Sequence, residues 1–445
     1  MSGVEVYRGA FGRDEAEKLL WRAGFGPRPG QVAELARLGL EGAVRSLTRP
    51  GPERLTGPPP RDDKGRRIAP TDHWGHDHLW WLDRMVRTNR PLVERMTLVW
   101  HDWFATSNGG VGSQKLMLGQ NELFRSHALG SFSELLLDVT KDPAMLLWLS
   151  GSNSTRWAPN ENYARELMEL FTLGAGRGYS EDDVRAHARS LTGWRNDWKE
   201  SKGPVNFRFD DEAHDAGVKK VFGTRGRFDW KDSCRLCLEH PKHASFFVSK
   251  LWSYFIPGEP KASTSRALEQ HYVSQDHAVR PLVEAILQHP ALYTGPRMVK
   301  PPIVYTAGLL RGRGSGIDTE AWSWLGSLAG QQLFYPPNVA GWEDDRWLDT
   351  ASFRGRWATA NHAAKPYALD TEKDKRPLDA GKLVDNAVRF WGNPAISGRT
   401  RRALQGFAKD AFKTANDSWK KEAYPTLVEN ALRQLVAVSP DYLTS

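Results

Sequence analysis

Ionisable side chains are concentrated in the segment 159–174, which is otherwise rich in apolar residues. Glu161, Arg165 and Glu169 follow one another at four-residue steps, and Glu166 lies between the last two. Inside a cleft, carboxylates with shifted pKa values can act as general acid, general base or metal ligand, and an arginine can hold an anionic group. These four residues are therefore predicted as candidate catalytic residues.

The same segment is predicted to form a helix, because Pro159 suits a first turn and Gly174 suits an end. At about 100° per residue the charged side chains fall within an arc of about 140°, opposite the apolar ones. An apolar run at 143–149 precedes the segment and a second helix follows it, so the charged face is expected to line a cleft. The alternative is a solvated face held by ion pairs worth about 0.2–0.5 kcal/mol each.

Two other segments carry side chains that can move a proton. His101 lies at the margin of the apolar face of an amphipathic helix predicted over 91–105. His214 and Asp215 are adjacent in an irregular segment, and loops carry functional residues disproportionately. His101 and His214 join the candidate catalytic set, since histidine titrates closest to neutral pH. Asp215 joins it as the neighbour of His214. For His101 the alternative is a hydrogen-bonded structural residue.

The spacing of possible ligands assigns neither a metal nor a cofactor, and both stay unknown. His73, His76 and His78 lie close together, but their spacing does not put three ligands on one side of a helix. Cys234 and Cys237 form a CxxC without a second pair, so both are predicted to be reduced packing residues.

The composition indicates a globular protein and hints at an anionic partner. Its 445 residues include 61 basic and 53 acidic side chains, with a formal charge of +8. The two signs are intermixed and no nucleic-acid-binding motif is visible, so a nucleic-acid partner is disfavoured. The 19 tryptophans suit core packing, docking surfaces or platforms for sugar rings, and core packing is expected for most.

No uninterrupted apolar run reaches about 18 residues, so no membrane span is predicted. The first ten residues lack a basic stretch followed by an apolar one, and we therefore expect a cytoplasmic protein.

Helical patterns dominate the chain, and only short strands such as 205–209 are expected. The predicted fold is therefore predominantly all-α, a multi-helical single domain over 8–438 with long irregular loops. That domain is expected to have two lobes, 8–194 and 231–438, joined by the irregular segment 195–230.

Several longer motifs occur in a fixed order along the chain. They are Leu20–Gly26, Trp100–Thr106, Asp142–Leu146, Asn160–Gly174, Leu191–Trp194, His214–Asp215, Lys250–Trp252 and Pro336–Trp342. In these motifs the chain resembles, over nearly its whole length, the bacterial domain-of-unknown-function family numbered 1800. The resemblance implies no settled activity. Members often look exported and tend to be encoded beside a family numbered 1501, which is similar to sulfatase-like or phosphatase-like proteins.

Two functions follow from these observations. The first is an enzyme of the hydrolase or transferase class, in which the acidic cleft and the histidines act on a polysaccharide or another anionic substrate. The second is a non-catalytic scaffold or partner of a family-1501 protein, in which Glu161, Arg165 and Glu169 form a structural network.

Overall fold

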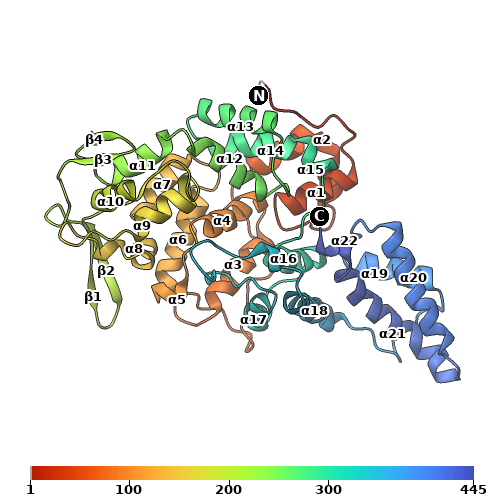
Figure 1. Ribbon diagram of the computed structural model, residues 1–445. Helices are drawn as coiled ribbons and strands as arrows, with labels where there is room; N and C mark the ends of the chain where they lie inside the picture. Colours follow the sequence, from red (N-terminus) through yellow and green to blue (C-terminus); the bar gives the residue numbers. More distant parts are fainter. Residues whose placement is uncertain (1–2) are drawn as a thin grey trace.

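Helices make up most of the chain in the computed structural model, which describes residues 3–445 (Figure 1). Among these residues there are 22 α-helices and two sheets of two strands each. The predicted all-α class is thereby confirmed. No helix in this part of the chain is both long and apolar enough to cross a membrane.

The first half of the helices lies between Arg13 and Glu239. They are α1 (Arg13–Arg22), α2 (Gln31–Thr48), α3 (His76–Arg87), α4 (Pro91–Trp103), α5 (Asn108–Val111), α6 (Gln114–Ser126), α7 (Phe132–Thr140), α8 (Pro143–Trp148), α9 (Asn162–Glu166), α10 (Glu181–Ser190) and α11 (Trp230–Glu239).

The second half completes the body and forms the C-terminal bundle. They are α12 (His243–Ser253), α13 (Ala262–Ser274), α14 (Val279–Gln288), α15 (Pro290–Thr294), α16 (Pro302–Arg313), α17 (Ala321–Leu328), α18 (Thr350–Ala364), α19 (Ala380–Phe390), α20 (Gly398–Lys413), α21 (Ser418–Ala437) and α22 (Pro440–Leu443).

The short strand predicted at 205–209 lies within the second of four strands, all of which fall between residues 194 and 226. β1 (Trp194–Lys199) pairs antiparallel with β2 (Gly203–Phe209), and the register shifts between Arg195 and Asp197. This hairpin projects from the helical body at the lower left of Figure 1. β3 (Lys219–Val221) pairs with β4 (Thr224–Gly226) beside α10.

The first hydrophobic core is built around aromatic rings from α4, α7 and α12. Trp100 and Trp103 are fully buried, with ring centroids 5.6 Å apart. The rings of Phe132 and Phe247 lie 4.4 Å apart in the same cluster. Large buried rings contribute much apolar area and fix the orientation of the helices that carry them. Both expected lobes contribute to this core, and the division into lobes stays a prediction.

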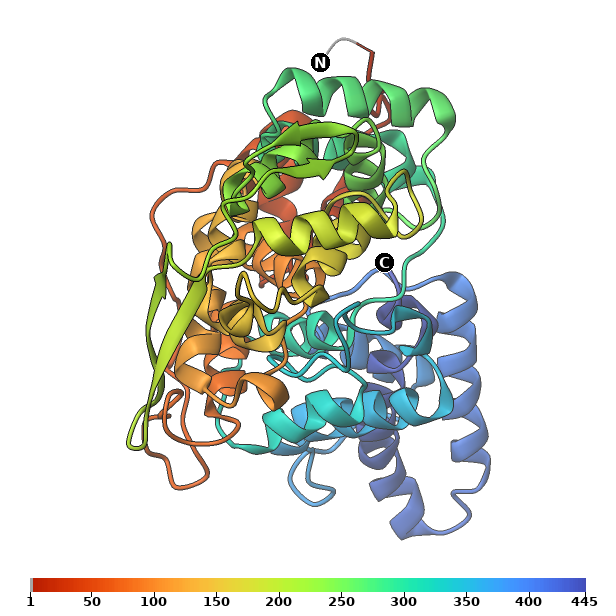
Figure 2. The ribbon, with the colours of Figure 1, turned by 60° about the vertical axis from the view of Figure 1, so that its left-hand side comes forward.

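The second core surrounds α16, in which every residue from Pro302 to Arg311 is buried. A helix that is buried all round lies inside a protein body rather than on its surface. Figure 2 shows the segments after residue 300, cyan to blue, gathered beside the N-terminal part of the chain. Arg311 is buried in α16 and donates to Met85 O and Val86 O, both at 3.0 Å, which ties α16 to α3.

Candidate functional site

The acidic segment does not form the regular helix that was predicted. An α-helical turn, α9, is followed by a π-helical stretch at Leu167–Thr172, and Pro159 lies before the helix. The amide of Leu173 donates to Met168 O at 2.9 Å, five residues back, as expected in a π-helix. The wider turns rotate the later side chains away from the positions that a 100° step predicts.

Three side chains from other segments satisfy the carbonyls at the end of this helix. Lys250 Nζ donates to Leu170 O at 2.9 Å, Trp103 Nε1 to Phe171 O at 3.1 Å and His243 Nδ1 to Thr172 O at 2.9 Å. A helix leaves its last carbonyls without partners in its own backbone. Burial lowers the pKa of Lys250 to about 8.

The charged face of the segment is an ion-pair network centred on Arg165. Its guanidinium lies 3.4 Å from both Glu161 and Glu169 and 2.8 Å from Glu181 of α10. These hydrogen bonds, first of all those to Glu181, raise the pKa of Arg165. The Arg165 side chain is 34% exposed, so the network lies at the surface. Exposed pairs of this kind contribute at most about 1 kcal/mol each.

Glu166 stands apart from this network. It is half-buried, and burial and the charge of Glu169 raise its pKa. Neither Glu166 nor its three predicted companions line any of four cavities of about 180 to 490 Å³ in the described chain. The cleft expected beside this face is not among those cavities.

His101 lies in an aromatic cage inside the second core. The rings of Trp81, Phe334 and Trp342 lie 5.3, 5.6 and 5.4 Å from the imidazole. Burial lowers the pKa of His101 to about 3, so the ring is neutral at physiological pH. Its neighbour Asp102 accepts hydrogen bonds from the Tyr254 hydroxyl at 2.6 Å and from the Trp342 amide at 2.8 Å.

His214 and Asp215 hold the end of α10. His214 Nδ1 donates to Thr192 O at 2.9 Å, and Asp215 pairs with Arg189 at 2.7 Å. Among the described residues, no hydrogen bond or ion pair connects these two side chains to His101 or to the acidic segment. The candidates predicted from sequence therefore occupy three separate surroundings.

His73, His76 and Glu320 place three possible metal-ligand atoms within 4.8 Å of one another. His76 Nδ1 accepts a hydrogen bond from the Ala69 amide at 2.9 Å, so a neutral His76 carries its proton on Nε2. That Nε2 lies 3.3 Å from Glu320 and donates to it. Since Nδ1 is occupied, a metal could bind His76 only through Nε2, which would require Nδ1 to carry the proton and to donate; the hydrogen bond from Ala69 therefore does not fit a metal.

A cavity of about 490 Å³ lies between α7, α11 and the turn from α13 to α14. Its walls combine apolar side chains with groups that can react or carry charge. The lining residues are Ser133, Leu137, Lys231, Asp232, Cys234, Arg235, Leu238, Glu239, Asp276 and His277. Such a mixture is typical of small-molecule sites.

Ser133 and His277 contact each other at the wall of this cavity. Ser133 Oγ lies 3.3 Å from His277 Nδ1, and both side chains are half-buried. Burial lowers the pKa of His277, while the charge of Asp276 opposes the shift. A neutral imidazole beside a hydroxyl is the arrangement in which a histidine can take the proton of a serine.

The backbone fixes both groups. The Phe132 amide donates to His277 O at 3.0 Å, and Ser131 forms a β-bridge with Ala278. Asp276 and His277 both have positive φ, 49° and 59°, a region that costs a residue with a side chain about 1 kcal/mol or more. Consecutive strained residues persist only where the surroundings hold them, often at functional sites.

Ser133 is also the second residue of α7, whose N-cap is Ser131. The first amides of a helix have no partner in its own backbone. Within residues 3–445 the Ser133 amide has no acceptor, whereas the Glu134 amide donates to Ser131 Oγ at 3.4 Å. The Ser133 N–H is therefore a donor beside the Ser133 hydroxyl.

Cys234, the other nucleophilic side chain of the cavity, stays a thiol. It is fully buried, and burial raises its pKa to about 12. Arg235 of the same wall is paired with Asp232 and Glu239, at 3.0 and 2.8 Å. Of the cavity's serine and cysteine, only Ser133 has a histidine in contact with it among the described residues.

Sequence reasoning missed both Ser133 and His277. They are 144 positions apart and lie in none of the motifs. A weak signal was present, since Ser131 precedes an apolar helix as an N-cap residue would. The contact with His277 depends on how α7 packs beside the turn from α13 to α14.

Comparison with known proteins gives one match. The model of the family described as "Protein of unknown function (DUF1800)" matches residues 18–444. No curated protein and no solved structure matches the chain. The match covers nearly the whole chain and agrees with the resemblance seen in its motifs. The chain therefore belongs to the DUF1800 family.

Proposed function

We propose that this protein is a hydrolase in which Ser133 is the nucleophile and His277 the general base. The contact between Ser133 Oγ and His277 Nδ1, 3.3 Å long at the wall of a cavity of about 490 Å³, carries this proposal. The lowered pKa of His277 supports it, because a neutral imidazole can accept a proton at pH 7.

In the proposed reaction His277 Nδ1 takes the proton of the Ser133 hydroxyl as Oγ attacks the carbonyl carbon of an ester. The Ser133 N–H stabilises the oxyanion that forms. The C–O bond to the leaving alcohol then breaks, and His277 returns the proton to that alcohol. Water, activated by the same imidazole, attacks the acyl-serine and releases the acid.

The walls favour an ester with an apolar acyl part. Leu137 and Leu238 supply apolar surface, and Lys231 lies on the same wall. The cavity falls within the range of about 300–1,000 Å³ that is typical of small-molecule sites.

The test is covalent labelling with a fluorophosphonate, which forms a bond between phosphorus and an activated serine oxygen and releases fluoride. The full-length protein is incubated with the probe, and the labelled peptide is identified by mass spectrometry. Ser133→Ala and His277→Gln remove the two reacting groups. Ser274→Ala is the matched control, because Ser274 is an exposed serine at the end of α13.

We expect labelling of Ser133, lost in Ser133→Ala and slowed by about 10² or more in His277→Gln. Ser274→Ala should label like the wild type. Glu166→Gln and Glu169→Gln separate this site from the acidic segment that was predicted from sequence. If those two substitutions abolish labelling while Ser133→Ala keeps it, another serine is the reactive one and its reactivity depends on the acidic segment.

A second candidate function is a non-catalytic partner protein, favoured by exposed apolar side chains on α17 and α18. Trp324 and Leu328 lie one turn apart on α17, and Phe353 and Trp357 one turn apart on α18. These side chains are between 37% and 50% exposed, and the two helices pack together. Exposed apolar groups that cluster mark interaction surfaces. The expected partner is a family-1501 protein, and loss of its binding in Trp324→Ala/Trp357→Ala would support this function.

A further inference from the structure

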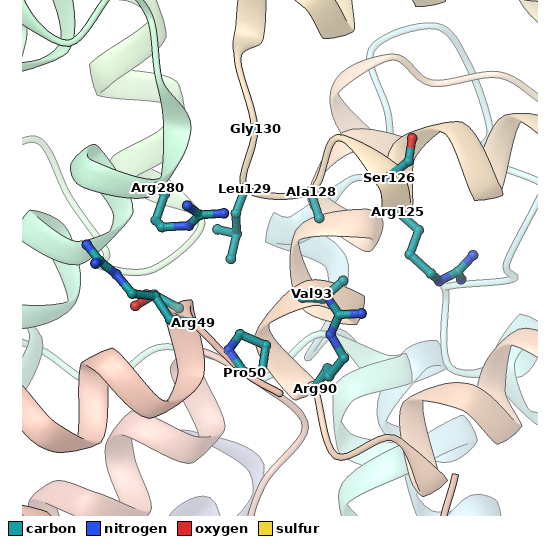
Figure 3. A pocket seen from close by; sticks show the side chains of 11 residues that line it. Arg49, Pro50, Arg90, Val93, Arg125, Ser126, Ala128, Leu129, Gly130 and Arg280 are labelled. Carbon is teal, nitrogen blue, oxygen red and sulfur yellow. The ribbon is translucent and has the colours of Figure 1, made fainter. Parts of the chain in front are cut away.

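We propose that a second cavity, where α2, α4, α6 and α14 meet, binds a phosphate or sulfate group carried by a small molecule. Its volume is about 300 Å³. Figure 3 shows Arg49 and Arg280 on one side of it and Arg90 and Arg125 on the other. Among the lining residues that the structure describes, none is acidic.

Two of these arginines already have carboxylate partners outside the cavity. Arg49 Nε lies 3.1 Å from Glu284. Arg125 Nε donates to Glu94 at 2.6 Å, and a further ion pair joins Arg125 to Glu122. Their charges are compensated, so they shape the wall more than they attract an anion.

The other two arginines are uncompensated. Within residues 3–445, neither Arg90 nor Arg280 makes an ion pair or donates a side-chain hydrogen bond to another residue. Arg90 Nε is buried without any partner. Buried donors in proteins are nearly always satisfied, so an acceptor is expected in the cavity. Two guanidinium groups facing one space leave a local excess of positive charge.

The helix termini around the cavity do not change this balance. Arg90 and Arg280 lie at the beginnings of α4 and α14, where helix dipoles are positive. Arg49 and Ser126 lie at the ends of α2 and α6, where the dipoles are negative. Two termini of each sign largely cancel, and the guanidinium groups decide which ions are attracted.

Guanidinium groups favour tetrahedral oxyanions, because their planar N–H groups donate in pairs to two oxygens of a phosphate or sulfate. A volume of about 300 Å³ is at the lower end of small-molecule sites and exceeds what a free ion needs. The ligand class that fits is a monoester of phosphate or sulfate with a group about as large as a sugar.

This site is independent of the proposed hydrolase. Gly130 and Arg280 line the arginine cavity, whereas Ser133 and His277 line the other one. The Ser131–Ala278 bridge separates the two pairs along the chain. Failure of serine labelling would therefore contradict the proposed hydrolase and not the anion site. Failure of anion binding would contradict the anion site and not the hydrolase.

The test is calorimetric titration of the full-length protein at low ionic strength with three probes: inorganic phosphate, inorganic sulfate and glucose 6-phosphate. Glucose is the neutral reference. Arg90→Gln/Arg280→Gln removes the two uncompensated charges. Arg266→Gln/Arg354→Gln is the matched control, because both residues are exposed and lie outside the cavity. Arg280→Gln alone serves if the Arg90 substitution disturbs folding.

We expect saturable binding with one site per chain, weakened at least tenfold in Arg90→Gln/Arg280→Gln and less than twofold in the control pair. Arg280→Gln alone should weaken it at least threefold. Tighter binding of glucose 6-phosphate than of phosphate identifies an ester as the ligand, and equal binding identifies the free oxyanion. Absence of saturable binding with all three probes, or equal weakening in the control pair, would overturn the proposal.

Discussion

Around Arg165 one cation has three carboxylate partners, whereas the side chains of Ser133 and His277 have, among the described residues, only each other as hydrogen-bond partners. The network of Glu161, Glu169 and Glu181 is partly exposed, and its ion pairs raise the pKa of Arg165 and lower that of Glu181. His277, in contrast, has a lowered pKa and contacts a serine at 3.3 Å. Dense charge in a sequence therefore does not by itself indicate reactivity, because paired ions satisfy one another.

The largest expected effect concerns Lys250, which donates a hydrogen bond to the Leu170 carbonyl at the end of the acidic segment. The pKa of Lys250 is about 8 in the folded protein and about 10.4 in an unfolded chain. Between these values the unfolded state binds more protons, so folding becomes more favourable as pH rises. We expect Lys250→Met to lose this gain, and its stability deficit in urea unfolding to grow by about 2 kcal/mol from pH 7 to pH 10.

The matched control for Lys250→Met is Lys242→Met. Lys242 is an exposed lysine just before α12, the helix that carries Lys250. An equal pH dependence in both variants would contradict the role given to Lys250.

The next effect is the pH dependence of serine labelling. Burial lowers the pKa of His277, which favours the neutral imidazole. The labelling rate should be level above pH 7 and should fall about tenfold per unit once the pH is below the pKa of His277. A midpoint above pH 7 would show that another group is the base.

A smaller effect is expected at the charged face. Arg165→Gln leaves the surrounding carboxylates to repel one another, but the site is partly exposed and screened. We expect a loss of less than about 1 kcal/mol in the free energy of unfolding, smaller still in 1 M salt. Arg185→Gln, which removes a single exposed pair, should cost less. A much larger loss for Arg165→Gln would mean that the network supports the core.

The smallest effect tests the strained turn. Asp276→Gly should raise the free energy of unfolding by about 0.5 kcal/mol, because glycine adopts positive φ without strain. Gln275→Gly should lower the free energy of unfolding, since Gln275 has a φ of −102° and no backbone strain that glycine could relieve. Slower fluorophosphonate labelling in Asp276→Gly would indicate that the strain positions His277. Unchanged labelling would show that the strain does not affect the reactivity of Ser133.

Local structure followed from local residues. Ser180 and Asp183 form a capping box at the start of α10, because both partners lie within one turn. The helix predicted over 91–105 is α4. The π-helical stretch was not foreseen, since the groups that satisfy its carbonyls come from positions as distant as Trp103 and Lys250.

By itself the sequence determined the helical class, capped helix starts such as that of α10 and membership of the DUF1800 family, because periodicity, capping and motifs are properties of neighbouring residues. Tertiary structure alone decided which polar groups meet. It buried His101 among aromatic rings, paired Asp215 with Arg189 and brought Ser133 to His277 across 144 positions. Burial and partners set the pKa of each group, and both depend on packing between distant segments.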